Sequence, residues 1–255
     1  MNEKTASFLL EKVRRDYNSI AEDFSATRMR EWTEFELFAP YIRNGMKVLD
    51  VGCGNGRLLS FFQKRFSNIF YTGIDNASRL LDEARLKRIH ALRLFSDEKN
   101  GKEFDTHNVC LKHANHENSK AEFFEGNMLS LPFPSETFDA VFSIASLHHI
   151  PSEKFRTQAL MEMKRVLKPH GVIIILVWNL WQKRYFYAFI RAFFRSIFTF
   201  GQYGLRDLFI PWKHVLDRYY YAFTFSELQK FLKKTSLSLE SYSRNRNILF
   251  VCKKK

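Results

Sequence analysis

The sequence predicts an α/β protein in which helices cover both faces of a mostly parallel sheet. Short apolar runs such as GVIIILVW alternate with longer segments whose apolar residues recur at helical spacing. Strands that are apolar throughout are typical of parallel sheets buried on both faces. A third observation is a run of three glycines, Gly52, Gly54 and Gly56, directly after the first such strand. Glycines at that place predict a turn that brings the main chain close to a ligand.

The first 44 residues are predicted to be helical. Leu9, Val13, Tyr17, Ile20 and Phe24 recur at helical spacing and indicate an amphipathic helix over residues 4–25. A second helix is expected over residues 31–43. It should end near Asn44-Gly45, because that dipeptide is a turn and helix-end signal.

Residues 45–178 show the alternation that predicts the parallel sheet. Strands are expected at MKVLDVG, IFYTGID, AEFFEG, TFDAVFSIA and GVIIILVW, and helices at RLLSFFQKRF, ASRLLDEARLKRIHA and EKFRTQALMEMKRVLK. The stretch from 92 to 120 is polar and weakly periodic, which predicts an insertion or a mobile loop.

The remaining residues, 179–255, begin with a segment of different composition. Residues 180–223 are rich in aromatic and basic side chains and are interpreted as a cap or substrate segment. FSELQKFLKKTSL then predicts a helix. LSLESYSRN and RNILFVCKK predict two final strands, antiparallel neighbours that are joined by a turn near Asn245.

The charge balance is strongly basic. The 255 residues include 40 Lys and Arg against 27 Asp and Glu, a net charge of +13. Such an excess favours a polyanionic partner such as nucleic acid or an acidic lipid surface, and it also fits a basic enzyme without such a partner. The three cysteines form no CxxC pair, so neither a metal site nor a disulfide framework is expected. The apolar run at the N-terminus is too short for a signal peptide, and a cytoplasmic location is predicted.

The glycines and two acidic residues predict the kind of ligand. A dinucleotide fingerprint reads G-x-G-x-x-G/A, but here the spacing is G-x-G-x-G and Arg57 stands where the last small residue belongs. That difference favours a ligand without a pyrophosphate. Asp50 precedes the glycines, and Asp75 closes the second strand, where an acidic side chain can accept both hydroxyls of a ribose.

Four motifs together resemble the class I S-adenosylmethionine-dependent methyltransferases. They are VLDVGCGNG, the Asp in GID, the GNM after the third strand, and FDAVFSIASLHHI, and they extend over roughly residues 45–178. The resemblance implies a Rossmann-like, seven-stranded sheet with six parallel strands and a last antiparallel one. It also implies S-adenosylmethionine as the cofactor.

The same resemblance implies the positions of the cofactor residues. Asp50 and the glycine loop would hold the methionine part; the loop consists of Gly52, Cys53, Gly54, Asn55 and Gly56. Asp75, with Asn76 beside it, would take the ribose, and Asn127 and Met128 would flank the adenine. The segment from Ser143 through Ile144 to Ser146 would line the methyl-transfer site.

A narrower resemblance is to the Trm9-type tRNA methyltransferases, which methylate a carboxymethyl group on a wobble uridine. It rests on YNSIAEDFSATR at residues 17–28, on LHHI, on a strand that ends in VW, and on the later FIPW and RYYYAF. It implies tRNA as the substrate and places Arg28 near the cofactor, so that residues 1–44 would cover the cofactor site. A small activating protein subunit is a further partner left open.

The acceptor determines whether a general base is needed. A carboxylate is already ionised at neutral pH, whereas an amine or phenol must lose a proton. His148 and His149 follow the fourth strand and are the candidate bases, with His148 assigned the catalytic role; the alternative is that one caps the strand and the other packs. Arg28 and Arg57 could neutralise an anionic acceptor, and Arg28 is also assigned a catalytic role; the alternative is that either is simply a surface cation.

Residues 183–200 allow three interpretations. Their aromatic side chains could form a lid over the active site, stack on the bases of single-stranded RNA, or lie in a membrane interface. Two acceptor classes therefore stay open: a tRNA nucleotide, or a small molecule such as a quinone, a lipid or a biosynthetic intermediate. A third interpretation, an inactive cofactor-binding scaffold, is disfavoured by the intact glycine loop and Asp75.

Overall fold

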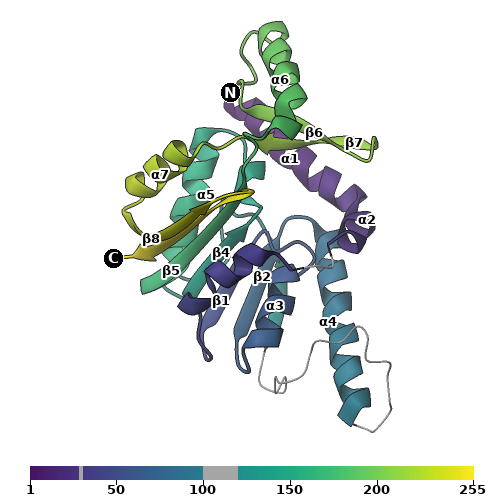
Figure 1. Cartoon of the computed structure of the whole chain (residues 1–255), viewed down its shortest axis with the longest axis vertical. Helices are drawn as coiled ribbons and strands as arrows, with labels where there is room; N and C mark the ends of the chain where they lie inside the picture. The colour runs from purple at the N-terminus through teal and green to yellow at the C-terminus, as the bar shows by residue number, and fades with distance from the viewer. Residues whose placement is uncertain (29–30, 100–119) are drawn as a thin grey trace.

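A computed structural model describes residues 1–28, 31–99 and 120–255. A seven-stranded sheet forms its centre, with the strand order β3-β2-β1-β4-β5-β9-β8 (Figure 1). The strands are β1 Lys47–Val51, β2 Phe70–Asp75, β3 Ala121–Glu125, β4 Phe138–Ile144, β5 Leu167–Trp178, β8 Leu237–Arg244 and β9 Asn247–Lys254. Within this sheet β9 runs antiparallel to both of its neighbours and the other pairs are parallel. This is the arrangement that the resemblance implied, and the turn predicted near Asn245 is confirmed.

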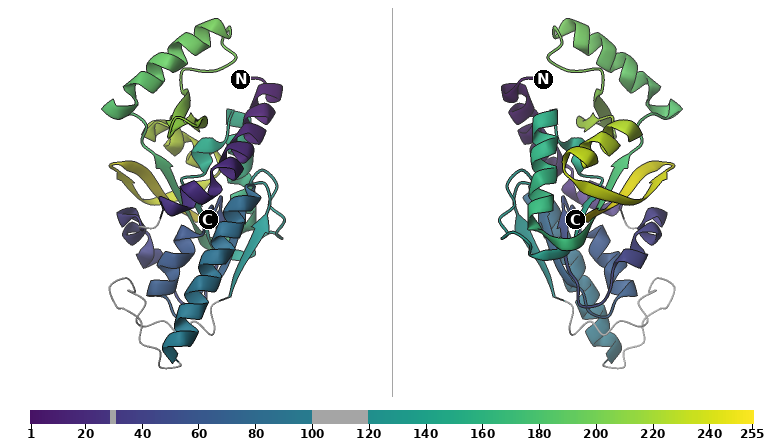
Figure 2. Two further views of the ribbon diagram at one scale, coloured as in Figure 1. Left: turned by 90° about the vertical axis from the view of Figure 1, so that its right-hand side faces the viewer. Right: turned by 90° about the vertical axis from the view of Figure 1, so that its left-hand side faces the viewer.

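Helices cover both faces of the sheet (Figure 2). They are α1 Glu3–Ser19, α2 Ala21–Ala26, α3 Arg57–Arg65, α4 Ser78–Lys99, α5 Glu153–Val166, α6 Phe186–Phe198 and α7 Phe225–Lys234. Strand β5 shows why its sequence is apolar throughout. Ile174 packs in a core with α3, whereas Ile173 and Ile175 point to the opposite core, with α5 and α7. Because alternate residues of a strand face opposite sides, both sides of β5 must be apolar.

The helix predicted over residues 31–43 is wrong. Two short 3₁₀ helices, Thr33–Leu37 and Ala39–Tyr41, occupy this stretch instead. Pro40 has no amide hydrogen, so a continuous α-helix would lose a hydrogen bond there. The 3₁₀ turn also places Phe35 and Phe38, three residues apart, on one face, and both are buried.

Two helix boundaries also differ from the prediction. The N-terminal helix breaks at Ile20, between α1 and α2. Helix α4 continues to Lys99, so residues 92–99 are helical rather than part of a loop. The remainder of the insertion predicted over 92–120 lies, apart from Lys120, outside the described residues.

A two-stranded hairpin, β6 Asp207–Trp212 and β7 Leu216–Tyr221, forms a second sheet that the sequence analysis did not assign. Its side chains alternate between two partners. Leu208 and Tyr220 pack with the inner face of α6, and Phe209 and Tyr219 pack with α1. The hairpin thereby joins α6 to the N-terminal helix, at the end of the molecule opposite the far end of α4 (Figure 1).

Burial predicts a clear contrast between two isoleucines. Ile174 is 0% exposed, so Ile174→Ala should lower the free energy of unfolding by about 2–5 kcal/mol through lost contacts and a cavity. Ile197 on α6 is 55% exposed, and Ile197→Ala should change stability by no more than about 0.5 kcal/mol. Urea denaturation followed by circular dichroism measures both. Equal losses in the two variants would contradict the burial assigned to β5.

Candidate active site

A pocket lies at the carboxyl ends of the parallel strands, where such sheets bind ligands. It encloses about 1100 Å³, including open solvent at its mouth. Its floor comes from the carboxyl ends of four neighbouring strands and the residues that follow them. These segments are Asp50–Asn55 at β1, Ile74–Asn76 at β2, Gly126–Met128 after β3, and Ile144–Ser146 at β4. The side toward the N-terminus is formed by Leu10, Val13 and Tyr17 of α1, by Phe24 of α2 and by Arg28.

The three glycines of the loop have left-handed backbone angles but differ in what surrounds them. Their φ angles are +76° at Gly52, +54° at Gly54 and +73° at Gly56. A Cβ at Gly52 would overlap the Ser146 side chain, so Gly52 permits close packing. A Cβ at Gly54 would meet nothing within 4 Å, and Gly54 borders the pocket. Gly54 therefore gives a ligand access to the main chain.

Asp75 fixes the shape of this loop. Its Oδ2 accepts a hydrogen bond from the Gly54 amide at 2.8 Å, and its Oδ1 accepts one from Ala77 at 2.9 Å. Burial raises the pKa of this carboxyl, and the amide hydrogen bonds act in the opposite direction. Each carboxylate oxygen has a second lone pair, so Asp75 can still accept from ligand hydroxyls. Asn76 follows it along the pocket wall.

Asp50 is a buried acceptor whose hydrogen bonding is incomplete. It is 2% exposed, and its Oδ2 accepts from the Tyr71 hydroxyl at 2.7 Å. Its Oδ1 has no partner within the described residues, although Asp50 borders the pocket. Burial raises the Asp50 pKa to about 7, and the negative charge of Asp75 contributes to the rise. A ligand that brings a cationic donor would satisfy this oxygen.

The other two residues of the loop have structural contacts. Asn55 is buried and donates from Nδ2 to the Ser25 Oγ of α2 at 3.1 Å, which ties the loop to the N-terminal helices. Cys53 borders the pocket, but burial raises the pKa of its thiol. The thiol therefore stays protonated at neutral pH and is no nucleophile.

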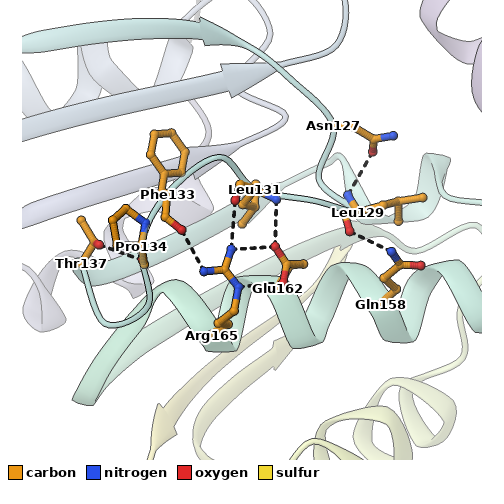
Figure 3. Close-up of polar contacts among 9 residues, drawn as sticks. All are labelled: Asn127, Leu129, Leu131, Phe133, Pro134, Thr137, Gln158, Glu162 and Arg165. Atoms are coloured by element: carbon orange, nitrogen blue, oxygen red, sulfur yellow. Dashed lines mark hydrogen bonds and ion pairs between the residues drawn. The ribbon is translucent and has the colours of Figure 1, made fainter.

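The segment after β3 is held in place by α5, as Figure 3 shows. The Asn127 side chain accepts from the Leu129 amide at 3.0 Å, and Gln158 of α5 donates to the Leu129 carbonyl at 2.9 Å. Arg165 donates to the carbonyls of Leu131 and Phe133, at 2.9 and 2.8 Å. These contacts fix the position of Asn127 and of its neighbour Met128, both of which line the pocket.

The prediction that Ser143 lines the site is wrong. Ser143 is fully buried, and its hydroxyl is hydrogen-bonded to that of Ser146 at 2.8 Å, beneath the pocket. Ile144, Ala145 and Ser146 do line the pocket, in agreement with their predicted place. Successive side chains of a strand point to opposite faces, so Ser143 and Ile144 cannot both face the pocket. The motif alone did not show which of the two would be buried.

The prediction that His148 is catalytic is also wrong. His148 is fully buried, does not border the pocket, accepts at Nδ1 from the Trp178 amide at 3.2 Å, and stacks on Tyr220. His149 borders the pocket, but its Nδ1 donates to the Tyr219 carbonyl and its Nε2 accepts from the Tyr17 hydroxyl, both at 2.8 Å.

The histidines are also held neutral by their surroundings. Burial lowers the pKa of His149 to about 3 and lowers that of His148 well below its usual value. Both nitrogens of His149 already have protein partners, so this imidazole has no lone pair left for a substrate proton. The surroundings of both histidines agree with the alternative interpretation, in which one caps the strand and the other packs.

Two arginines border the pocket without acidic partners. Arg28 lies over the rings of Phe24 and Trp212, with its guanidinium carbon 4.9 and 5.6 Å from their centres. Arg57 lies over Trp32 at 5.0 Å. Within the described residues neither forms an ion pair. Burial lowers the pKa of both, and the charge of Arg28 further lowers that of Arg57, to about 10.

The sheet with one reversed strand and the glycine loop tied to Asp75 define a Rossmann-like methyltransferase. Residues 49–175 match the family described as "Methyltransferase domain". The chain belongs to the S-adenosylmethionine-dependent methyltransferases.

Similar proteins support this assignment. The mouse "tRNA (carboxymethyluridine(34)-5-O)-methyltransferase ALKBH8" is 30% identical over 171 residues, which make up 67% of this chain and 20% of that protein. A fission yeast protein with the corresponding enzyme name is 28% identical over 210 residues, covering 82% of this chain and 70% of that protein. This chain thus spans well under half of the mouse relative.

Solved structures show the same fold. A methyltransferase from Methanosarcina mazei superposes with a TM-score of 0.65 at 20% identity, covering 89% of this chain and 99% of that one. A Haloferax volcanii structure, described as a complex between the Trm112 methyltransferase activator and a methyltransferase, gives a TM-score of 0.62 at 15% identity, covering 94% and 96%.

The residues of the pocket fit S-adenosylmethionine, the methyl donor of this family. Gly54 offers an open main-chain surface, and Asp75 has lone pairs for ribose hydroxyls. The unpartnered Oδ1 of Asp50 matches the ammonium group of the methionine part. No group of three or more metal-binding side chains occurs in the ranges that the structure describes.

Most predicted residues therefore meet in one pocket. They are Arg28, Asp50, Gly52, Cys53, Gly54, Asn55, Asp75, Asn76, Asn127, Met128 and Ile144. Gly56 starts α3 just outside the lining, as its left-handed N-cap. Sequence reasoning missed Tyr71, Ser25 and the role of Tyr17. Tyr17 and Ser25 belong to the YNSIAEDFSATR motif, which signalled their importance without revealing their partners.

Two glycines allow a controlled test of cofactor binding. Gly54 and Gly45 both have positive φ and open space where a Cβ would stand, but only Gly54 lines the pocket. Either change to Ala should cost about 1 kcal/mol of stability through backbone strain. Only Gly54→Ala should weaken S-adenosylmethionine binding, by roughly tenfold or more, because the methyl group blocks the main chain. Isothermal titration calorimetry measures the affinities, and equal effects of the two changes would contradict the placement of the ligand.

The raised pKa of Asp50 predicts pH-dependent binding. Its pKa in the cofactor-free protein is about 7, so most Asp50 side chains are protonated at pH 5.5. A bound ammonium favours the ionised form. Affinity should therefore increase between about pH 5.5 and 7, by up to roughly tenfold per pH unit. Asp50→Asn should abolish this slope.

Asp50→Asn should weaken cofactor binding near neutral pH but should stabilise the cofactor-free protein against unfolding. Because the folded-state pKa lies above the ordinary carboxyl value, the cofactor-free protein loses stability as the pH rises from about 4 to 7. An asparagine at this position has no proton to lose, so the variant should gain stability relative to the parent across that range. Thermal unfolding at several pH values checks this. If cofactor affinity in Asp50→Asn still increased with pH as in the parent, Asp50 would not be part of the cofactor site.

Proposed function

We propose that this chain methylates a carboxylate, the carboxymethyl group of a wobble uridine in tRNA. The observation that carries the proposal is the pair Arg28 and Arg57, which border the pocket without acidic partners among the described residues. Two cations with no counter-charge favour an anionic acceptor beside the cofactor. Arg57 is held by cation–π contact with Trp32, so its guanidinium is already positioned before a substrate binds.

The state of the histidines supports the same acceptor. S-adenosylmethionine supplies an activated methyl group on a positively charged sulfur, so the chain's main task is to align the acceptor oxygen with it. His149, the histidine at the pocket, has both nitrogens engaged and a pKa near 3. A phenol or amine acceptor would need a proton acceptor there, whereas an ionised carboxylate needs none.

Two further observations agree with a tRNA substrate. The mouse and fission yeast relatives are described as enzymes that act on carboxymethyluridine at position 34 of tRNA. The net charge of +13 favours a polyanionic partner. The proposal includes an activating protein subunit, because a structural neighbour is described in complex with the Trm112 activator. Activity assays therefore use the chain alone and together with a Trm112-type subunit.

The alternative function is methylation of a small apolar molecule. It is favoured by the aromatic part of the pocket wall, which includes Phe24, Trp32, Phe35 and Trp178. In that case the methyl group would be recovered in a solvent extract rather than in tRNA. The two functions are thus separated by where the label appears.

Methyl transfer to defined tRNAs tests the proposal. With a methyl-labelled cofactor, tRNA that carries 5-carboxymethyluridine should accept the label, and tRNA with an unmodified wobble uridine should not. Arg57→Gln should lower kcat/KM by roughly 10- to 100-fold, as expected for a lost hydrogen bond to a charged group. Arg57→Lys should retain much of the activity if charge is the requirement.

Arg65→Gln is the matched control. Arg65 lies on the same helix, α3, but is bound to Glu36 on the surface, away from the pocket. This change should leave kcat/KM within about twofold of the parent. Label in a solvent-extractable product, with none in either tRNA, would decide for the alternative function. An Arg57→Gln enzyme with full activity on tRNA would refute the assigned role of the arginine.

A further inference from the structure

Helix α6 carries an apolar surface that faces away from the protein. The helix projects from the body of the molecule in both views of Figure 2. Seven of its large apolar side chains are at least 37% exposed, with Phe198 at 77%. They are Phe186, Tyr187, Ile190, Phe193, Phe194, Ile197 and Phe198. Phe200, just beyond the helix, is 100% exposed. Monomeric proteins in water rarely expose a patch of this kind without a partner.

These side chains form one continuous face. At 100° per residue the seven positions fall within an arc of roughly 140° around the helix axis. The opposite side is occupied by smaller residues, Ala188 and Ala192, with Phe189, and it packs against the β6–β7 hairpin. The helix is thus anchored by its inner side. The large apolar residues recur at positions on the other side, which no part of the described protein covers.

The position of α6 separates it from the active site. No residue of α6 lines the pocket, and the side chains expected to form a lid, such as Phe193 and Phe194, point to solvent. The inner side of α6 belongs to the same apolar cluster as Trp178, and only Trp178 borders the pocket. The lid interpretation of residues 183–200 is therefore wrong for this helix.

The cations of α6 are turned away from the outer face. Arg191 forms an ion pair with Asp217 of β7 at 2.6 Å, and the Arg195 guanidinium lies 4.0 Å from the centre of the Phe209 ring. Stacking on RNA bases would require cations beside the rings to contact the phosphates. The outer face of α6 offers aromatic and aliphatic groups without those cations, which favours an apolar partner.

The surroundings of the face are basic. Lys183 and Arg184 are exposed at the start of the helix. From residue 179 to residue 200, the stretch that includes α6, the sequence contains no Asp or Glu and four Lys and Arg. An apolar, Phe-rich face with basic residues at its margin is typical of helices that lie in a membrane interface, where the cations contact anionic headgroups.

We propose that α6 lies in the surface of an anionic lipid bilayer and docks this chain there. The 13 residues of α6 extend only about 20 Å, less than the hydrocarbon thickness of about 30 Å, so the helix would lie in the plane of the membrane. Over the residues that the structure describes, no helix is both long enough and apolar enough to cross a bilayer.

Vesicle sedimentation with the full chain tests the proposal. The protein should sediment with phosphatidylcholine vesicles that contain about 30% phosphatidylglycerol and bind pure phosphatidylcholine at least several-fold more weakly. The double change Phe193→Ser and Ile197→Ser should reduce binding to the anionic vesicles at least tenfold. Lys183→Gln with Arg184→Gln should mainly reduce the preference for anionic lipid.

A matched control uses another helix. Leu86 and Ile89 of α4 are 60% and 47% exposed, so Leu86→Ser with Ile89→Ser removes a comparable apolar surface elsewhere. This control should bind vesicles like the parent. Circular dichroism confirms that each variant is folded. The proposal is overturned if the parent does not bind anionic vesicles, or if the Phe193→Ser, Ile197→Ser variant and the Leu86→Ser, Ile89→Ser control bind them equally well.

Two other occupants give distinct results. If α6 contacted RNA, the Phe193→Ser and Ile197→Ser variant would lose tRNA binding while vesicle binding was absent in the parent. If α6 contacted a second copy of the chain, sedimentation equilibrium would show a dimer in the parent and a monomer in the variant, again without vesicle binding. Either result would replace the membrane as the partner of this face.

Discussion

The hydrogen bond between the Gly54 amide and the Asp75 carboxylate, at 2.8 Å, is the contact on which the site depends. It joins the turn after β1 to the end of β2, so that two neighbouring strands present one binding surface. Gly54 itself adopts a positive φ, a conformation that costs other residues free energy. The rest of the pocket is arranged around this turn: Asn55 links it to α2, and Ser146 fills the space that Gly52 leaves.

The electrostatics of the pocket divide it into two parts. Asp50 and Asp75 lie at the strand ends, where burial raises the pKa of both carboxyls. Arg28 and Arg57 also border the pocket, and burial lowers the pKa of both guanidinium groups. A ligand with a cationic and a hydroxylated end suits the first part, and an anionic group suits the second. The neutral His149 between protein partners adds no base, which agrees with an acceptor that is already ionised.

The aromatic and basic stretch of the sequence contains two different surfaces. Tyr219 and Tyr220 of β7 are buried and hold the histidines and α1 in place. The Phe residues on the outer side of α6, by contrast, are exposed. The composition of this stretch is nearly uniform, and only the register of the helix and of the hairpin separates the side chains that stabilise the fold from those that face a partner.

The sequence by itself determined the parallel core and most of the cofactor pocket. Apolar strands such as β5 and the glycines before α3 require particular backbone structures, so local pattern and the family resemblance assigned Asp50, Gly54 and Asp75 to one site, and all three border the same pocket. Tertiary structure decided what depends on contacts between distant segments. Ser143 and His148 belong to the same motif as Ile144 and His149, but packing against Ser146 and Tyr220 buries them away from the pocket. The β6–β7 hairpin and the outward face of α6 likewise arise from long-range packing, because the same aromatic side chains can serve in a core or on a surface, and only their neighbours decide which.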